Sequence, residues 1–573
     1  MNQQYYEKGF TSFFNLDHQT MKFYQSYHAW FKQRYFILPT DYHQPIMTQN
    51  STAHPKGLYV LYSTEMWERF NFYGMRAILS LFLVNALAFK QNEASILYGG
   101  FLGLSYLMPM IGGYVSDRYL GNRNCIILGG LVMSIGQLFL FSSASTFQTN
   151  FSMASLFMWI GLLFLIVGNG FFKPNISSMV GSLYPKGDSR LDSAFTIFYM
   201  GINTGAFLGM LICPMVGDIK VDGVRNVEAF KWGFLAAGSA MLLGTILFHF
   251  LKNKYIVDPN GQAVGLKPVF NNQTKTDEES EKAEFSTKSI LTTVGLFIAL
   301  VFGIHFYIVT EEANPIKDWI YPIIYSSGIS LAFLILTDKT LTKIERDRIW
   351  VMYIIAFFVM FFWSAFEQAG SSLTFIADQQ TDLNFFGIEL PPSSVQNANS
   401  IFIILLALPF SYLWVRLQKR GIEPNSPTKQ AIGLLLLAIG YLIIANQVKD
   451  LGTGKLGVVW FFVMYLFHTM GEICLSPIGL SLVSKLAPKR FSSLLMGVWF
   501  IANAAGYALA GTLGALLPPT KIEAGVALPS FLGFEIHNLY EFFMVFVILA
   551  GLASILMYIL AVGPLKRMMH GIK

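Results

Sequence analysis

Four ionisable side chains lie inside one long run of apolar residues near the start of the chain. Glu65, Glu68, Arg69 and Arg76 fall between residues 58 and 87, a run long enough to cross a bilayer as a helix. Because an ionisable group at mid-membrane costs about 2.5–3.5 kcal/mol on insertion scales, these groups must face protein or water and pair with one another. Two carboxylates and two guanidiniums in such a place can hold, share or release a proton.

The spacing puts these charges on one side of a helix. At about 100° per residue, the four charged residues and Phe72 fall within an arc of about 100°, and Tyr73 lies just beside it. The remaining surface is apolar and can meet lipid or other helices. An ion pair that only fastens two helices together is the alternative, but intramembrane charges usually mark the path of an ion or substrate, so we favour a functional role.

Composition places the chain among membrane proteins. It has 573 residues, of which 54% are hydrophobic and 13% charged, and its mean hydropathy is +0.49, more apolar than a soluble domain needs. Three cysteines lie singly in apolar runs, so no disulfide framework or CxxC metal pair is expected. The net charge of +6 does not indicate nucleic-acid binding, because the basic residues sit in short loops between the apolar runs.

Apolar runs of about 20 residues or more recur along the chain, each long enough for a transmembrane helix. They predict an all-α integral membrane protein with fourteen spans, arranged as six, two and six. The predicted spans are 58–87, 95–116, 124–145, 152–183, 193–217, 230–251, 289–309, 319–337, 349–377, 397–416, 429–447, 457–485, 491–517 and 537–563.

The spans divide the chain into four parts. Residues 1–57 are an N-terminal extension that we expect to be disordered or to lie on the membrane surface, and Met47 is a second candidate start, so residues 1–46 need not exist in the native protein. Residues 58–251 are predicted to form a first six-helix bundle, and residues 349–573 a second one with a short cytoplasmic tail. Residues 252–348 hold a polar cytoplasmic linker and a two-helix hairpin.

The distribution of Lys and Arg predicts the orientation. With the N-terminus inside, the inner loops hold 24 of these residues and the outer loops hold 8, and such an excess marks the cytoplasmic side. Both termini are then cytoplasmic, in a multi-pass protein of the cell (inner) membrane. Two bundles joined by a cytoplasmic linker also suggest a midplane site between them, as in transporters that work by alternating access.

Four further segments combine glycine, proline and polar residues inside or beside apolar runs. Residues 112–123 read GGYVSDRYLGNR, residues 168–175 GNGFFKPN, residues 198–205 FYMGINTG and residues 471–480 GEICLSPIGL. Glycines in the first segment allow close helix contact, and Asp117 with Arg118 and Arg123 can cap helices and pair across the bundle. The second segment lacks the GxxxxGK[ST] spacing of a phosphate loop, and its Lys173 is a lone intramembrane cation.

Together these segments resemble the major facilitator superfamily and, within it, a bacterial-type member of the proton-coupled oligopeptide transporter (POT/PTR) family. The ExxERFxYYG, GxFKPN, FYxxINxG and GELxxSPxGL patterns of that family occur in order, and the resemblance covers about residues 58–565. Two positions depart from it. Phe72 replaces the first tyrosine of the first pattern, and Gly99 stands where animal members carry a histidine, so proton handling is expected to depend on carboxylates.

The resemblance implies a proton-coupled symporter that imports di- and tripeptides by alternating access, with the substrate at the membrane midplane between the bundles. A peptide is a zwitterion, so its site needs a cationic pole, for which Arg76 and Lys173 are available, and an anionic pole, for which Glu472 is available. Asn203 and Asn399 can bond the ends or the backbone of the peptide. The resemblance also implies proton coupling by Glu65, Glu68, Arg69 and Lys173, an outer gate of Arg76 and Glu367, and pocket walls of Tyr73, Tyr106, Trp363 and Trp499.

Other interpretations of these residues stay open. Without the resemblance, helix packing would explain the two asparagines and Tyr106 equally well, and core packing would explain the two tryptophans better. His305 and His468 have no partner at metal spacing and are expected to be core histidines. We expect no metal and no cofactor, with protons as the coupling ion. The expected partners are the peptide and the lipid bilayer, and the oligomeric state is open, with a monomer as the default.

Three alternative functions can be separated by experiment. A symporter of the same fold could move another solute such as nitrate, although an anionic pole at Glu472 disfavours a small anion. A membrane-embedded hydrolase would need a nucleophile–base pair or HExxH-type ligands, and the sequence shows neither, so enzyme activity is not expected. A sensor or scaffold would bind its ligand without accumulating it against a gradient.

Overall fold

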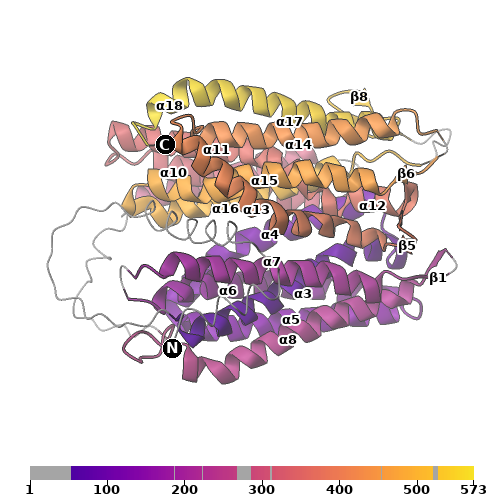
Figure 1. Ribbon diagram of the computed structural model, residues 1–573, viewed down its shortest axis with the longest axis horizontal. Helices are drawn as coiled ribbons and strands as arrows, with labels where there is room; N and C mark the ends of the chain where they lie inside the picture. The colour runs from indigo at the N-terminus through magenta and orange to yellow at the C-terminus, as the bar shows by residue number, and fades with distance from the viewer. Residues whose placement is uncertain are drawn as a thin grey trace, which may run out of the picture.

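The computed structural model describes residues 53–185, 188–221, 223–267, 285–309, 313–452, 454–520 and 527–572. Long helices make up most of this part of the chain, and short strands occur only in the connections between them (Figure 1). Almost all of the predicted N-terminal extension and residues 268–284 of the polar linker lie outside the described residues, so the expectations for these parts are not addressed by the structure.

Six helices form a first set that packs together. α3 lies along α7 and α8, and α5 lies along α6 and α8. Their buried side chains form one large hydrophobic cluster, as the apolar runs require. In Figure 1 most of this set, coloured indigo to magenta, occupies the lower half of the view. The helices are α3 (Lys56–Ala86), α4 (Gln91–Val115), extended by the π-helical turn η1 (Ser116–Leu120), α5 (Asn122–Thr146), α6 (Phe151–Ser182), α7 (Leu191–Gly217) and α8 (Phe230–Tyr255), preceded by η2 (Val227–Ala229).

Two residues of the segment 112–123 make contacts of the kind that was expected. A Cβ atom at Gly112 would collide with the backbone of Gly170 on α6, so glycine does allow the close helix contact. Arg123, on α5, caps a helix within the first set. It donates hydrogen bonds to the carbonyl oxygens of Ile256 and Val264, just after α8, where helix termination leaves carbonyl oxygens without helical partners. The expectation that Arg123 can cap a helix is confirmed.

A two-helix hairpin follows the linker. It consists of α9 (Thr287–Ile308), η3 (Ile316–Ile320) and α10 (Tyr321–Leu336). α10 packs against α9 on one side and against α16 and α4 on the other. His305 stacks on Trp319 with ring centroids 4.0 Å apart, and its Nδ1 lies 2.7 Å from the carbonyl oxygen of Asp318. These contacts fasten α9 to η3.

The second set of helices packs around another large hydrophobic cluster. α14 lies between α15 and α17, α11 lies along α16, and α13 lies along α15. The elements are α11 (Lys343–Phe366), η4 (Glu367–Gly370), α12 (Ser372–Gln380), η5 (Pro392–Asn397), α13 (Ala398–Lys419), α14 (Ser426–Val448), α15 (Val459–Leu486), η6 (Lys489–Phe491), α16 (Ser492–Gly514), α17 (Leu539–Val562) and α18 (Pro564–Met568).

All the described strands lie in loops that the positive-inside rule places outside. They gather at the right-hand end of the view in Figure 1. Three antiparallel hairpins, β1–β2, β4–β5 and β7–β8, cap the connections, and β3 pairs in parallel with β6. The strands are β1 (Lys220–Val221), β2 (Val224–Arg225), β3 (Thr381–Asp382), β4 (Asn384–Phe385), β5 (Ile388–Glu389), β6 (Leu456–Gly457), β7 (Ser530–Phe531) and β8 (Phe534–Glu535).

The helices lie where the spans were predicted. Among the described residues, 12 helical segments are long and apolar enough to cross a membrane, and each coincides with a predicted span. α3 and α15 coincide with the two remaining predicted spans, so the total of fourteen stays a prediction. One span differs in detail: the predicted helix 349–377 is interrupted, because α11 ends at Phe366 and the 3₁₀ turn η4 begins at Glu367.

The two sets of helices meet most closely where α4 lies along α16. A Cβ atom at Gly99 would lie 2.7 Å from the Cα atom of Gly511 and 2.7 Å from the carbonyl oxygen of Tyr507. Both distances are too short for a real contact, so a side chain at position 99 is excluded from this arrangement. A histidine at this position could not be accommodated.

Candidate functional site

A cavity of about 240 Å³ lies between the two sets of helices. This is slightly below the range of about 300–1,000 Å³ that is usual for small-molecule sites, so it suits a small occupant. All nine residues predicted to bind substrate line it, together with Arg69 and Glu367. The nine are Tyr73, Arg76, Tyr106, Lys173, Asn203, Trp363, Asn399, Glu472 and Trp499.

The charged face of α3 lies beside this cavity. Arg69 Nε lies 2.7 Å from Glu65 Oε1 and 3.2 Å from Glu68 Oε2, so one guanidinium serves both carboxylates. Both glutamates are fully buried, and neither lines the cavity, whereas Arg69 does. Asn169 Nδ2 on α6 donates to Glu68 Oε1 at 3.2 Å. Protonation of either carboxylate would therefore weaken its attraction to Arg69, the cation that faces the cavity.

Lys173 contacts an aromatic ring. Its Nζ lies 3.6 Å from the centre of the Tyr106 ring, in a cation–π contact, and no ion pair to Glu65 or Glu68 is formed within the described structure. Arg69 forms the ion pairs with these two carboxylates instead. Lys173 faces the cavity with its charge held by an aromatic face, which leaves it able to bind an anionic group of a ligand.

Arg76 forms an ion pair across the two sets of helices. Its Nη2 lies 3.0 Å from Glu367 Oε2, and its Nη1 lies 3.3 Å from Oε1. Both side chains are more than nine-tenths buried, and the guanidinium lies 5.0 Å from the centre of the Tyr73 ring. Ser80, one turn further along α3, donates to the carbonyl oxygen of Gly370 in η4. These contacts join α3 to the interruption between α11 and α12.

Glu472 provides a carboxylate on the wall from the second set. Its Oε2 accepts a hydrogen bond from Asn399 Nδ2 at 2.9 Å, and the same amide lies 3.0 Å from Thr469 Oγ1. No cation forms an ion pair with Glu472 within the described structure, so its negative charge is available to a ligand. Asn203, on α7, donates to the carbonyl oxygen of Tyr199 at 2.9 Å and keeps its side-chain oxygen for other partners.

Aromatic rings close the sides of the cavity. Tyr106 and Tyr507 meet edge to face with centroids 4.7 Å apart, across α4 and α16. Trp363 lies edge-on to Phe366 at 5.4 Å and to Tyr507 at 6.0 Å. Trp499 is 5% exposed and lies directly over Gly479, where a Cβ atom would meet its ring. Phe72, at the position of a family tyrosine, stacks on Phe101 and does not line the cavity.

The structure adds lining residues that the sequence analysis did not select. Asn503 and Tyr507 follow Trp499 at intervals of four residues on α16, so helical spacing from Trp499 would have indicated both. Gln396 lies in η5, a connection, and had no such signal. The other additions are Tyr199, Ile202, Ala206, Met210, Phe366, Ala369, Ser400, Ile403, Tyr465, Leu475 and Phe500.

Two further observations concern chemistry that the site does not show. Among the described residues, no group of three or more His, Cys, Asp or Glu side chains is placed to hold a metal ion. His468 is fully buried between aromatic rings, including Tyr441 at a centroid distance of 4.6 Å, and is not among the residues that line the cavity. Its surroundings are those of a core histidine.

Comparison with known proteins shows the family. A family model described as the POT family matches residues 123–525. The chain is 33% identical over 485 residues to the peptide transporter YePEPT of Yersinia enterocolitica, an alignment that covers 82% of this chain and 89% of that protein. It is 32% identical over 478 residues to a di-/tripeptide transporter of Lactococcus lactis subsp. cremoris, covering 80% of this chain and 88% of that one.

The fold agrees with this relationship. A crystal structure of a POT family transporter in complex with a thioalcohol-conjugated peptide matches with a TM-score of 0.71 at 29% identity, covering 90% of this chain and 97% of the other. The predicted all-α membrane fold of the major facilitator superfamily is confirmed, and so is the family that the sequence patterns indicated. The chain belongs to the POT family of membrane transporters.

Proposed function

We propose that the protein is a proton-coupled symporter that imports di- and tripeptides by alternating access. The observation that carries this proposal is the charge of the cavity wall. The first set of helices contributes Arg69, Arg76 and Lys173, and the second contributes Glu472. A free peptide has a carboxylate at one end and an ammonium at the other, so cations on one wall and a carboxylate on the other match its two ends.

Each lining residue then has a role that its chemistry allows. Lys173 and Arg76 bind the peptide carboxylate, and Glu472, held by Asn399, binds the ammonium. Asn203 bonds the peptide backbone. Tyr73, Tyr106, Trp363 and Trp499 form the walls against which peptide side chains pack. The relatives from Yersinia and Lactococcus are named as a peptide transporter and a di-/tripeptide transporter, which supports the same class of substrate here.

Proton coupling uses the buried carboxylates behind the cavity. Glu65 and Glu68 hold Arg69, which faces the cavity, so protonation of either carboxylate changes how strongly that cation is held. Proton binding and peptide binding then act on the same contacts and favour the same state of the transporter, which is the requirement for coupling.

Alternating access moves the two bundles, residues 58–251 and 349–573, about the midplane site. The linker and hairpin, residues 252–348, connect them, and both termini lie on the cytoplasmic side of the cell membrane. Arg76 and Glu367 act as an outer gate, because their ion pair crosses between the bundles and lines the cavity. The pair must break before a peptide can enter from outside.

Uptake in proteoliposomes under an imposed pH gradient tests the proposal. Labelled dialanine should accumulate above its external concentration, and a protonophore should abolish the accumulation. Lys173→Ala should abolish it as well, because the variant loses a cation of the cavity wall. Accumulation of nitrate without peptide would indicate another solute, and saturable peptide binding without accumulation would indicate a sensor. Recovery of the peptide intact separates transport from hydrolysis.

A further inference from the structure

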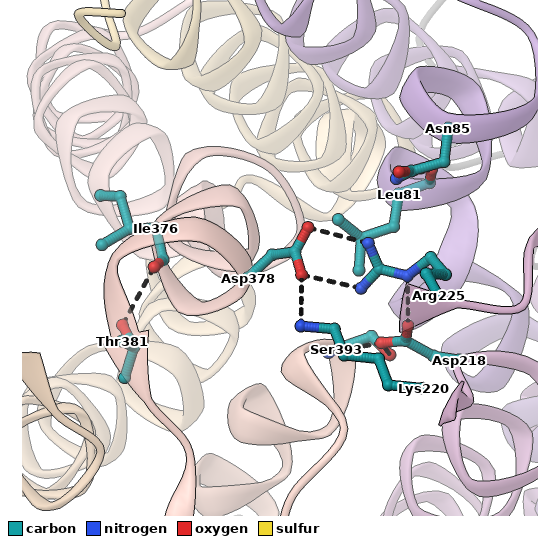
Figure 2. A network of polar contacts seen from close by, with 9 residues as sticks. All are labelled: Leu81, Asn85, Asp218, Lys220, Arg225, Ile376, Asp378, Thr381 and Ser393. Atoms are coloured by element: carbon teal, nitrogen blue, oxygen red, sulfur yellow. Dashed lines mark hydrogen bonds and ion pairs between the residues drawn. The ribbon is translucent and has the colours of Figure 1, made fainter. Parts of the chain in front are cut away.

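An ion network joins the two sets of helices away from the cavity, at the end that is predicted to lie outside (Figure 2). Arg225, in β2, makes two parallel bonds to Asp378 in α12, with Nη1–Oδ2 2.8 Å and Nη2–Oδ1 2.9 Å. Lys220, in β1, adds a third contact to Asp378, with Nζ–Oδ1 3.0 Å. Two parallel N–H···O bonds make an Arg–carboxylate pair directional as well as strong.

Asp218 connects the same arginine to a second segment. Its Oδ1 accepts from Arg225 Nε at 2.9 Å, while its Oδ2 accepts from Ser393 Oγ at 2.6 Å and from the Ser393 backbone N–H at 3.1 Å. Asp218 follows α7 directly, and Ser393 lies in η5. We call these five residues, Asp218, Lys220, Arg225, Asp378 and Ser393, the outer clasp.

The outer clasp is balanced in charge and largely shielded from solvent. Two cations meet two anions, and the exposed fractions of the side chains are 0% for Asp218, 8% for Arg225, 12% for Asp378 and 21% for Lys220. Removing one member of a buried pair leaves the other as an uncompensated charge, which is strongly unfavourable. The contact between the outer ends of the two sets of helices is therefore stabilised only while all four charged side chains stay together.

The outer clasp also reaches the segments that carry site residues. Ser393 accepts a hydrogen bond from Gln396 Nε2 at 3.1 Å through its carbonyl oxygen, and Gln396 lines the cavity. η5 leads directly into α13, where Asn399 holds Glu472. Asp378 lies in α12, the helix that follows the η4 turn containing Glu367. The network thus holds η5 and α12, two segments of the second set that adjoin residues lining the cavity.

We propose that the outer clasp holds the outer side of the cavity closed and positions η5 and the start of α13, and that it opens once in each transport cycle. Asp218 and Arg225 are positioning residues in this inference, because neither is among the residues that line the cavity. The inference rests on the alternating access in the proposed function. The outer clasp is then a second closure, in addition to the ion pair of Arg76 and Glu367. It lies away from the substrate, so movement of the helices opens it.

Distances between spin labels test this directly. Labels at Gln148→Cys, between α5 and α6, and Asp450→Cys, between α14 and α15, report the separation of the two outer ends, and both sites are exposed. The native cysteines Cys125, Cys213 and Cys474 are buried, which limits background labelling. In Arg225→Gln the population with widely separated labels should rise roughly fivefold or more, as expected for coupling of moderate strength.

A matched control uses an ion pair within one set of helices. Lys231 and Glu228 pair at 3.3 Å beside the same hairpin, so Lys231→Gln removes a nearby cation without touching the other set. Its distance distribution should equal that of the parent. An unchanged distribution in Arg225→Gln would overturn the proposal, as would an equal change in both variants.

A reversible cross-link provides an independent test if Arg225→Gln does not fold. Asp218→Cys with Ser393→Cys places two thiols where the native side chains already touch. Oxidation should abolish peptide uptake, and reduction should restore it. Full uptake by the oxidised protein would show that the clasp stays closed throughout the cycle and would overturn the proposal. If the parent protein moves no peptide, the proposed function is wrong. The spin-label distances still test whether the outer clasp holds the outer ends together.

Discussion

Asn169 on α6 donates a hydrogen bond to Glu68 on α3, with Nδ2–Oε1 3.2 Å, and neither side chain is more than 1% exposed. The only other partner of that carboxylate within the described structure is Arg69 at 3.2 Å, a guanidinium that Glu65 shares, while Lys173 contributes its charge from nearby. An N–H donor stabilises the ionised form of a carboxylate over the protonated form.

Replacing this amide should therefore move the pH dependence of transport. Asn169→Leu keeps the branched shape of the side chain and removes the donor, so Glu68 binds its proton more readily. We expect the midpoint of uptake against external pH to move to higher pH by about one unit, since a hydrogen bond to a charged group contributes about 1.5–3 kcal/mol and one pH unit corresponds to about 1.4 kcal/mol. Asn71→Leu is the control, because within the described structure Asn71 bonds only to the amide of Gln137 and to Met133 Sδ. A shift toward lower pH would contradict the assignment.

A second pH effect concerns stability at the inner end of α7. Hydrogen bonds from the Arg190 side chain lower the pKa of Asp188 below its ordinary value, although partial burial opposes this, and Arg190 also donates to the carbonyl oxygen of Ala53 at 2.7 Å. A lowered pKa in the folded protein gives stability that is present above the unfolded pKa of about 3.9 and is lost as pH falls below it.

The melting temperature of detergent-solubilised Asp188→Asn should then lie about 1–3 °C below that of the parent between pH 5 and pH 7. The difference should disappear as the pH falls through the range below about 4, where Asp188 of the parent becomes protonated. A difference that grows at low pH would mean that the carboxylate does not stabilise the fold in its ionised form.

The sequence predicted the helices well because each span is a local feature. An apolar run of about 20 residues can adopt few structures other than a helix in a bilayer. The charged face of α3 could also be predicted, because helical spacing decides which residues share a side. The interruption of the helix at Glu367 was not predicted, because an apolar run indicates the length of a span and not a break within it.

The family resemblance selected residues that do line one cavity, and it paired Arg76 with Glu367, a contact that the structure contains. It did not indicate that Lys173 lies on the ring of Tyr106, or that Arg69 alone, among the described residues, forms the ion pairs with Glu65 and Glu68. The outer clasp was missed for a different reason. Lys220 and Arg225 lie in a short outer loop, where charges are ordinary, and only the folded structure brings them to Asp378.

The contact of α4 with α16 makes a prediction about packing. Gly99→Ala places a Cβ atom 2.7 Å from the Cα of Gly511, so the two helices must move apart. We expect a loss of about 1–3 kcal/mol, typical of overpacking, seen as a lower melting temperature. Gly295→Ala, on α9, is the control, because a Cβ atom there meets nothing within 4 Å. Equal melting temperatures for Gly99→Ala and the parent would show that α4 and α16 are not packed this closely.

Recognition of the peptide ammonium predicts a difference between two ligands. Glu472→Gln keeps a hydrogen-bonding group beside Asn399 and removes the negative charge. It should weaken binding of a dipeptide with a free amino end by roughly tenfold or more, the effect of losing about 1.4 kcal/mol or more from a charged hydrogen bond. Binding of the N-acetylated dipeptide should change little. Competition against labelled peptide measures both, and an equal loss for the two ligands would exclude ammonium recognition by Glu472.

Energy coupling predicts a separation between uphill uptake and exchange. A proton that enters down its gradient supplies about 2.3 kcal/mol per 100 mV of potential and about 1.4 kcal/mol per pH unit. One proton could thus support a peptide gradient of several hundredfold, since about 1.4 kcal/mol is a factor of ten. To use this energy, protonation must change a contact that depends on conformation, and Arg69 makes such a contact because Glu65 and Glu68 share it beside the cavity.

Glu65→Gln and Glu68→Gln imitate the protonated carboxylates and cannot release a proton. Each variant should lose accumulation of peptide under a pH gradient, yet keep counterflow, in which labelled peptide exchanges for unlabelled peptide without net proton movement. Counterflow also serves as the folding control, because it requires an intact cavity that can open to both sides of the membrane. If both variants still concentrate peptide, the coupling proton is bound elsewhere, and the two carboxylates that line the cavity, Glu367 and Glu472, become the groups to substitute.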